Sequence, residues 1–322
     1  FIATSGQKNS SSAYPYTYQG RQYWFLKSGC NEVDRQTKEL ARSNVIVSGI
    51  LLLRQYGGGK VLVPPKARNA GKNYYGINTM DQEGLETLEA LMHFLGDRYM
   101  NSNGKYGTIV NWIVGNEVNN YNDYNYMGKL SFNEYIDAYT RSFRVVSMAL
   151  RSVYSKARVY ISLDHLWNIL QPHGKCYTSK STLDAFAKRL KQEGDINWNL
   201  AFHPYPSPLT DPNFWNDKVT NSDSTKQVTM KNLGYLTNYV STHFRSDVRI
   251  LLSEQGFTSV SYGTTNETLQ AAAWAYAYYI TEFNDKVDAF IMNRHVDHKQ
   301  ETSQGLYLGV WTNKKGNLEY AD

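Results

Sequence analysis

The 322-residue chain is predicted to be an α/β protein that folds as a (β/α)8 TIM barrel. Short apolar runs rich in β-branched residues alternate with longer helical patterns along the chain, which is typical of repeated βαβ units. The length also suits a single barrel, because α/β barrels of this size form one unit. We therefore expect residues 1–322 to form one barrel domain.

Seven strands are predicted from these apolar runs, at residues 45–53, 74–78, 108–115, 158–163, 198–202, 248–253 and 287–292. An eighth strand is needed to close the barrel. It is either residues 22–26 or a segment upstream of Phe1, and the sequence leaves both alternatives open. No long helical pattern follows the last strand, so we expect the first or last barrel unit to be incomplete.

The predicted helices between the strands have start signals and apolar stripes. Ser131 is followed three residues later by Glu134, a capping box in which each side chain satisfies a backbone N–H group. Apolar residues then recur at steps of three and four up to Val153, and similar stripes lie in residues 85–95 and 183–190. These stripes are expected to pack in the core.

The composition predicts a folded globule, with 41% hydrophobic and 20% charged residues. The net charge of +5 is spread over 34 basic and 29 acidic residues without a basic run, so nucleic acid is not an expected partner. The 26 Tyr and 7 Trp suit stacking on sugar rings, although most such rings pack in cores. Cys30 and Cys176 can pair or stay reduced, and free thiols are favoured.

No membrane span is expected, because the longest apolar stretch, residues 45–53, is far shorter than the ~20 residues that cross a bilayer. The chain begins at Phe1 and ends at Asp322, so we expect that flanking segments have been removed. We further expect a monomer that is secreted or held at the cell surface.

Two glutamates follow predicted strands. Asn116-Glu117 comes after residues 108–115, and Glu254 comes after residues 248–253. Active sites of barrels lie at the C-terminal ends of strands, and a carboxylate placed there costs desolvation free energy unless it is paired or has a function. Each glutamate alone could instead form a salt bridge or cap a helix. Their joint placement favours glycoside hydrolysis, which needs two carboxyl groups.

Asn-Glu at one strand end and Glu at a strand end three units later resembles clan A of the retaining glycoside hydrolases, and within it a group of bacterial barrel proteins without an assigned function. The resemblance covers nearly all of the chain. It implies Glu117 as acid/base at strand 4, Glu254 as nucleophile at strand 7, Asn116 as a partner of the sugar hydroxyl next to the reacting carbon, and no cofactor. Strand 8 departs from the clan, because Asn293-Arg294-His295 stands where an aromatic platform is often found.

Other strand ends supply candidate sugar contacts. His203 and Tyr205 could orient Glu254 or hold a hydroxyl, although both residue types also suit a barrel rim. Arg54 could stabilise the nucleophile's charge or form a structural salt bridge. His165 and Trp167 follow the fifth strand, where Trp167 is a candidate stacking platform.

Several other motifs are rejected. Residues 57–60 lack the spacing of a phosphate-binding loop, and no nucleophile elbow is present. A metal site of His203, His295, Asp297 and His298 is disfavoured because no metal-ligand spacing accompanies these residues.

The expected reaction is double displacement on an oligo- or polysaccharide with a β-linkage. It requires the carboxyl groups of Glu117 and Glu254 to lie ~5–5.5 Å apart, and the pKa of Glu117 to be raised. Two alternatives remain open: a transglycosylase that uses the same residues, and a carbohydrate-binding barrel without catalysis.

Overall fold

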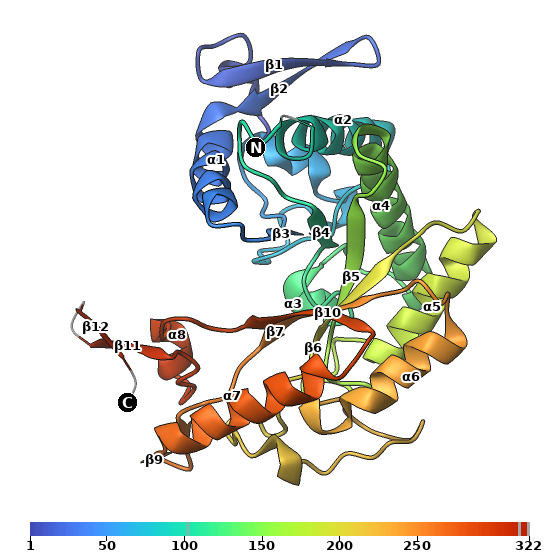
Figure 1. The fold of residues 1–322 in the computed structure, drawn as a ribbon. Coiled ribbons are helices and arrows are strands. Elements are labelled where there is room, and N and C mark those ends of the chain that lie inside the picture. Colours follow the sequence, from blue (N-terminus) through green and yellow to red (C-terminus); the bar gives the residue numbers. More distant parts are fainter. Residues whose placement is uncertain (102, 315–316, 321–322) are drawn as a thin grey trace. The chain divides into compact units, whose positions relative to one another are not determined.

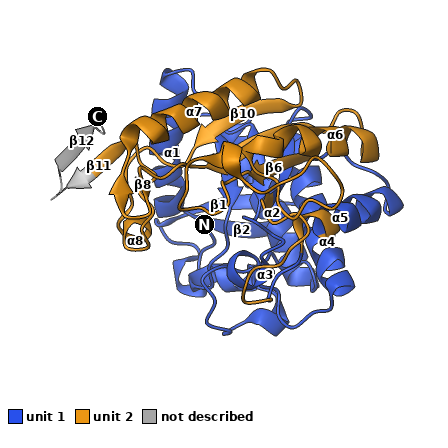
Figure 2. Ribbon diagram, turned by 90° about the horizontal axis from the view of Figure 1, so that it is seen from below, with its two compact units in different colours: residues 1–162, 175–177, 182–198 blue, residues 163–174, 178–181, 199–322 orange. Residues whose placement is uncertain are grey.

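The computed structural model describes residues 1–101, 103–314 and 317–320 (Figure 1). The chain divides into two compact units (Figure 2). Unit 1 comprises Phe1–Ser162, Lys175–Tyr177 and Thr182–Trp198, and unit 2 comprises Leu163–Gly174, Thr178–Ser181 and Asn199–Asp322.

Unit 1 is built around three parallel strands in the order β3, β4, β5, with Leu51 opposite Val114 and Val114 opposite Ile161. An antiparallel hairpin of β1 and β2 precedes them, and helices α2 and α4 pack on one another. The elements are η1 (Ser5–Gln7), β1 (Ala13–Tyr18), β2 (Arg21–Leu26), α1 (Lys27–Arg42), β3 (Ser48–Leu51), η2 (Gly57–Leu62), η3 (Pro65–Ala67), α2 (Gln82–Tyr99), β4 (Asn111–Val114), α3 (Tyr121–Tyr124), α4 (Phe132–Val153), β5 (Arg158–Asp164) up to Ser162, and α5 (Ser179–Gln192) from Thr182.

Unit 2 is built around three parallel strands in the order β6, β7, β10, with Phe202 and Phe290 on either side of Leu252. Two short antiparallel hairpins, β8 with β9 and β11 with β12, lie outside this group. The elements are β6 (Asn199–His203), η4 (Phe214–Asn216), η5 (Met230–Asn232), α6 (Leu233–His243), β7 (Ile250–Gln255), β8 (Val260–Ser261), β9 (Thr264–Thr265), α7 (Glu267–Glu282), β10 (Val287–Met292), α8 (Lys299–Thr302), β11 (Trp311–Lys314) and β12 (Asn317–Tyr320).

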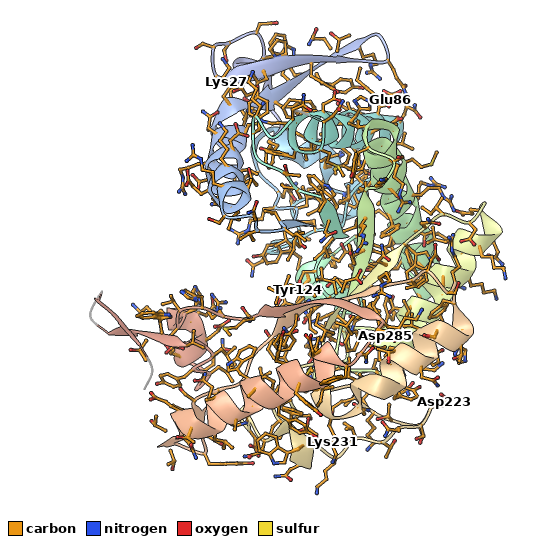
Figure 3. The ribbon with its side chains drawn as sticks, in the orientation of Figure 1. Lys27, Glu86, Tyr124, Asp223, Lys231 and Asp285 are labelled. Carbon is orange, nitrogen blue, oxygen red and sulfur yellow. The ribbon has the colours of Figure 1, made fainter. Side chains whose placement is uncertain are left out.

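The helix signals read from the sequence are confirmed. Ser131 accepts from the N–H of Glu134, whose carboxylate accepts from the N–H of Ser131, so α4 begins with the predicted capping box. Most of the apolar stripe of α4 is buried, including Phe143 and Leu150 at no exposure, while Phe132 and Val153 at its ends are half-buried. Side chains fill the space between strands and helices within each unit (Figure 3).

The α/β class with parallel strands joined by helices is confirmed, and six of the seven predicted strands are present within a few residues of their expected bounds. Residues 74–78 are not a strand. Their backbone bonds go to three separate segments, with Tyr75 donating to Leu53, Gly76 to Tyr126 and Asn78 to Leu62 at the end of η2. β3 pairs directly with β4. Residues 22–26 form β2, which pairs antiparallel with β1 and is therefore not the parallel strand that would close a barrel. Closure by eight strands stays a prediction.

Two smaller expectations are met. Cys30 and Cys176 are both buried and form no disulfide. Among the described residues, none of the helices combines the length and apolar character that crossing a bilayer demands.

Candidate active site

Glu254 lies near the end of β7, where both oxygens of its carboxylate have partners. Oε1 accepts a hydrogen bond from the Tyr205 hydroxyl at 2.8 Å, and Asn293 Nδ2 lies 3.4 Å from the same oxygen. Oε2 lies 3.8 Å from His203 Nδ1. The Glu254 side chain is still 33% exposed, so it is a fixed carboxylate that an incoming ligand can reach.

The order of the strands explains why these residues meet. His203 ends β6, Glu254 lies at the end of β7, and Asn293 follows β10, and the carboxyl ends of neighbouring parallel strands share one edge of a sheet. Asn293 also donates to Tyr205, so the phenol, the amide and the carboxylate form one network. A Cβ on Gly256 would lie 2.0 Å from the Asn293 carbonyl oxygen, so only glycine lets Asn293 approach.

One buried histidine, His203, lies beside Glu254, and a second, His165, lies near His203. His203 is 1% exposed, and its Nε2 shares a 3.1 Å hydrogen bond with Ser253 Oγ, which fixes the ring. Burial lowers the pKa of His165, the nearby His203 lowers it further, and Asp164 opposes both effects. His165 Nδ1 is buried without a hydrogen-bond partner among the described residues. Burial therefore favours the neutral form of the His165 imidazole.

Glu117 lies in unit 1, in a tight turn directly after β4. Its φ of 38° and the φ of 79° at Gly115 are both in the left-handed region, which a glutamate rarely adopts. Strained backbone of this kind persists only where the surroundings enforce it, and it is concentrated at functional sites.

The surroundings of this turn supply that enforcement. Ser162 of β5 accepts from Glu117 N at 3.0 Å through its hydroxyl and from Val118 N at 2.9 Å through its carbonyl. Two buried tyrosines of α4 donate to the carbonyls on either side of the turn, Tyr139 to Val114 at 2.8 Å and Tyr135 to Val118 at 2.6 Å. Glu117 is thus held by its backbone from two elements.

Arg54 and Asn116 also lie at this edge of unit 1. Leu51 and Val114 are the last paired residues of the neighbouring strands β3 and β4. Arg54 lies three residues after Leu51, and Glu117 lies three residues after Val114. Arg54 Nη2 donates to the Tyr74 hydroxyl at 3.0 Å, and the guanidinium lies 5.1 Å from the centre of that ring. Asn116 is half-buried next to Glu117 in the chain.

The expectation that Trp167 forms a stacking platform is wrong. Its indole has no exposed surface, its N–H donates to the Tyr235 hydroxyl, and its ring packs edge-on against Phe202 and Tyr239. The large apolar ring is retained in the core of unit 2 because burial there stabilises the fold.

Arg294 and His295 have other contacts in unit 2. Arg294 forms an ion pair with Glu301 at 2.7 Å, and the exposed His295 ring lies 6.2 Å from Trp311. Contact of either residue with a sugar stays a prediction. Within the described parts of the chain, no three His, Cys, Asp or Glu side chains gather as a metal site would require.

Sequence reasoning missed the residues that position Glu117. Ser162 falls within a predicted strand and Tyr139 within the predicted apolar stripe, but such patterns report burial and not the direction of a hydroxyl, and Tyr135 lies outside the stripe. The signal that could have found Ser162 is a hydroxyl in an otherwise apolar strand next to the strand that ends in Glu117.

The parallel strands and the helices that join them make this chain an α/β protein. One glutamate follows β4 and another lies near the end of β7. The chain belongs to a family of unknown function, DUF5722, whose model matches residues 2–321. No curated protein sequence matches it.

Solved structures show a similar fold. A family 1 β-glucosidase from Thermotoga maritima is 9% identical, with 92% of this chain and 76% of that chain covered and a TM-score of 0.57. A glucosidase from Croceicoccus marinus is 15% identical over 81% of this chain, with a TM-score of 0.52, and an exo-β-1,4-mannosidase from Opitutaceae bacterium strain TAV5 is 13% identical over 92%, with a TM-score of 0.51. The chain spans 46% and 48% of the length of these last two. Identities this low show the fold alone.

Proposed function

We propose that the protein is a retaining glycoside hydrolase that cleaves β-linked oligo- or polysaccharides, with Glu254 as nucleophile and Glu117 as acid/base. The observation that carries the proposal is the Glu254 carboxylate, which is held through Oε1 by Tyr205 and Asn293 yet remains one-third exposed. A nucleophile needs this combination of fixed orientation and access.

Further support comes from Glu117, which follows a parallel strand three strands before β7 in a backbone conformation that costs about 1–3 kcal/mol. The named functions of the proteins with a similar fold, glucosidase and mannosidase, agree with the proposal. Glu117 belongs to unit 1 and Glu254 to unit 2, so we propose that both units act as one catalytic domain. A secreted or cell-surface location would bring it to its substrate.

The reaction has two steps. Glu254 Oε2, the oxygen that does not accept from Tyr205, attacks the anomeric carbon while the bond to the leaving oxygen breaks and protonated Glu117 gives its proton to that oxygen. Glu117 then takes a proton from water, and the resulting hydroxide attacks the anomeric carbon and releases the Glu254 carboxylate. Both steps require the two carboxyl groups to lie ~5–5.5 Å apart.

A mechanism-based label tests the proposal. A 2-deoxy-2-fluoro aryl glycoside of a sugar that the protein hydrolyses should attach to Glu254, and peptide mass spectrometry locates the adduct. Glu254→Ala should remain folded but unlabelled. Attachment at another residue, or near-native turnover by both Glu254→Ala and Glu117→Ala, would overturn the assignment. Product analysis at high acceptor concentration separates hydrolysis from transglycosylation.

A further inference from the structure

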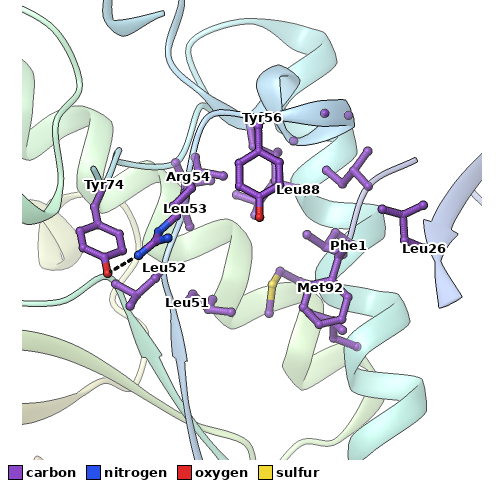
Figure 4. Close-up of a pocket in the computed structure, with 18 of the residues that line it drawn as sticks. Phe1, Leu26, Leu51, Leu52, Leu53, Arg54, Tyr56, Tyr74, Leu88 and Met92 are labelled. Atoms are coloured by element: carbon purple, nitrogen blue, oxygen red, sulfur yellow. Dashed lines mark hydrogen bonds between the residues drawn. The ribbon is translucent and has the colours of Figure 1, made fainter. Parts of the chain in front are cut away.

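Unit 1 contains an apolar pocket of about 600 Å³ beside β3 (Figure 4). Leu88, Leu91, Met92 and Leu95 contribute from one face of α2, where their spacing of three and four residues aligns them. Phe1 and residues 50–54, which belong to β3 and the segment directly after it, form another part of the wall. A volume of this size is within the ~300–1,000 Å³ typical of small-molecule sites.

The side of the pocket formed by β3 leaves apolar groups in contact with solvent. Ile50 is 42% exposed, Leu52 is 45% exposed and Phe1 is 42% exposed. Burying such surface under a ligand removes it from water and favours binding of an apolar molecule.

One end of the pocket is polar. Arg54 and Tyr74, joined by their hydrogen bond, lie together there, apart from Phe1 and Met92 at the other end (Figure 4). Arg54 follows β3 and Glu117 follows β4, and these two strands pair in parallel within unit 1, with Leu51 opposite Val114. The polar end therefore lies at the same edge of the sheet as the turn that contains Glu117, and α2 lines the apolar part.

We propose that this pocket holds the leaving group of the substrate, and that this group is an apolar aryl or alkyl alcohol. The inference rests on the proposed function, in which Glu117 protonates the leaving oxygen. That oxygen would lie at the Arg54 end, where the guanidinium favours the negative charge that develops as the bond to the anomeric carbon breaks. The apolar body would lie along the apolar side chains of residues 50–53 and of α2 that line the pocket.

Binding of 4-methylumbelliferone, a free apolar aryl alcohol, tests the pocket without any catalysis. Its fluorescence change on titration with the protein gives a dissociation constant. Leu52→Asp places a charge in the exposed wall and should weaken binding at least tenfold. Met148→Asp is the matched control, because Met148 is 59% exposed on α4 and does not line the pocket, and it should leave the affinity unchanged. Equal affinities of both variants and the wild type would overturn the proposal.

Hydrolysis tests the leaving-group role separately. On octyl and methyl glycosides of the same sugar, the wild type should have a kcat/KM at least tenfold higher for the octyl compound, and Leu52→Asp should remove this preference. Equal values in the wild type would reject the leaving-group role while leaving the glycosidase assignment intact. If the wild type binds 4-methylumbelliferone, Leu52→Asp does not, and no glycoside is hydrolysed, the pocket would be supported and the proposed function rejected. A wild-type dimer in sedimentation that Leu52→Asp dissociates without changing affinity would show that the wall is an interface between copies, and would also overturn the proposal.

Discussion

At the scale of single residues, the hydrogen bond from Tyr205 to Glu254 is the interaction on which the nucleophile's orientation most depends. Tyr205→Phe keeps the ring and removes the hydroxyl. A hydrogen bond to a charged group contributes about 1.5–3 kcal/mol, so kcat should fall by roughly 10- to 100-fold. KM should change little, because the lost bond orients the enzyme's own carboxylate.

Steady-state kinetics on an aryl glycoside checks this prediction. Tyr276→Phe is the control, because Tyr276 lies on α7 with 45% of its surface exposed and its ring stacks on Phe214. An unchanged kcat in Tyr205→Phe would mean that Glu254 does not need this bond for reaction.

Asp217 gives the stability a dependence on pH. Burial raises the pKa of its carboxyl from 3.8 to about 6, against opposing hydrogen bonds from Thr229 and Ser207 and the charge of Lys231. The folded state therefore favours the protonated carboxyl. Its contribution to the free energy of unfolding is fully present below pH 3.8 and is lost as the pH rises through about 6. Lys231, the middle residue of the 3-10 helix η5, is labelled in Figure 3.

Asp217→Asn should stabilise the protein at pH 8, where the wild type holds a buried carboxylate, and have little effect at pH 4. We expect a gain in Tm of about 2–5 °C at pH 8 after allowing for solvent screening. Thermal unfolding at both pH values measures it. The exposed Asp285→Asn should show no such difference. A gain of the same size at pH 4 would contradict the assignment to ionisation.

At the scale of elements, the turn after β4 depends on Gly115. A Cβ there would lie 2.8 Å from Val118 Cγ1 in addition to requiring a φ of 79°. The clash in Gly115→Ala should therefore destabilise the fold by about 1–3 kcal/mol, in addition to the cost of placing an alanine at a positive φ. The variant should also have a lower kcat, because the clash shifts Glu117.

Gly20 offers the matched control for this turn. Its φ is 74°, and a Cβ there would meet nothing within 4 Å, so Gly20→Ala has the backbone cost of roughly 1–2 kcal/mol without a clash. Chemical denaturation and kinetics together distinguish the two variants. Equal stability loss with full activity in both would show that the packing around Gly115 does not position Glu117.

At the scale of the whole molecule, the features that could be predicted from the sequence are those that produce a periodic pattern of apolar residues or a local capping signal. Alternation of strand and helix signals gave the class, and the capping box at Ser131 located the start of α4. Residues 74–78 look like a strand by composition, but which loops their backbone groups would bond depends on tertiary contacts that no local pattern contains.

The candidate site was predictable to a similar extent. Glu117 and Glu254 stand out because a carboxylate after an apolar run is costly, whereas the fate of Trp167 depends on which side of its loop faces the core. The contacts of Tyr205 and Asn293 with Glu254 arise from the order of β6, β7 and β10. Strand order follows from the fold and can be anticipated once the barrel class is accepted.

Azide can rescue variants that lack either glutamate, and the anomer of the product distinguishes the nucleophile from the acid/base. The expected pair of products requires both units to act on one substrate. In Glu254→Ala, azide can occupy the space of the missing nucleophile and attack a β-glycoside from that face, giving the α-glycosyl azide. In Glu117→Ala, an activated aryl glycoside still forms the intermediate on Glu254, and azide then attacks from the opposite face to give the β-glycosyl azide. Proton NMR of the products identifies each anomer. The exposed Glu83→Ala should keep normal turnover and form no azide adduct. The same anomer from both variants would mean that Glu117 and Glu254 do not work from opposite faces of one sugar.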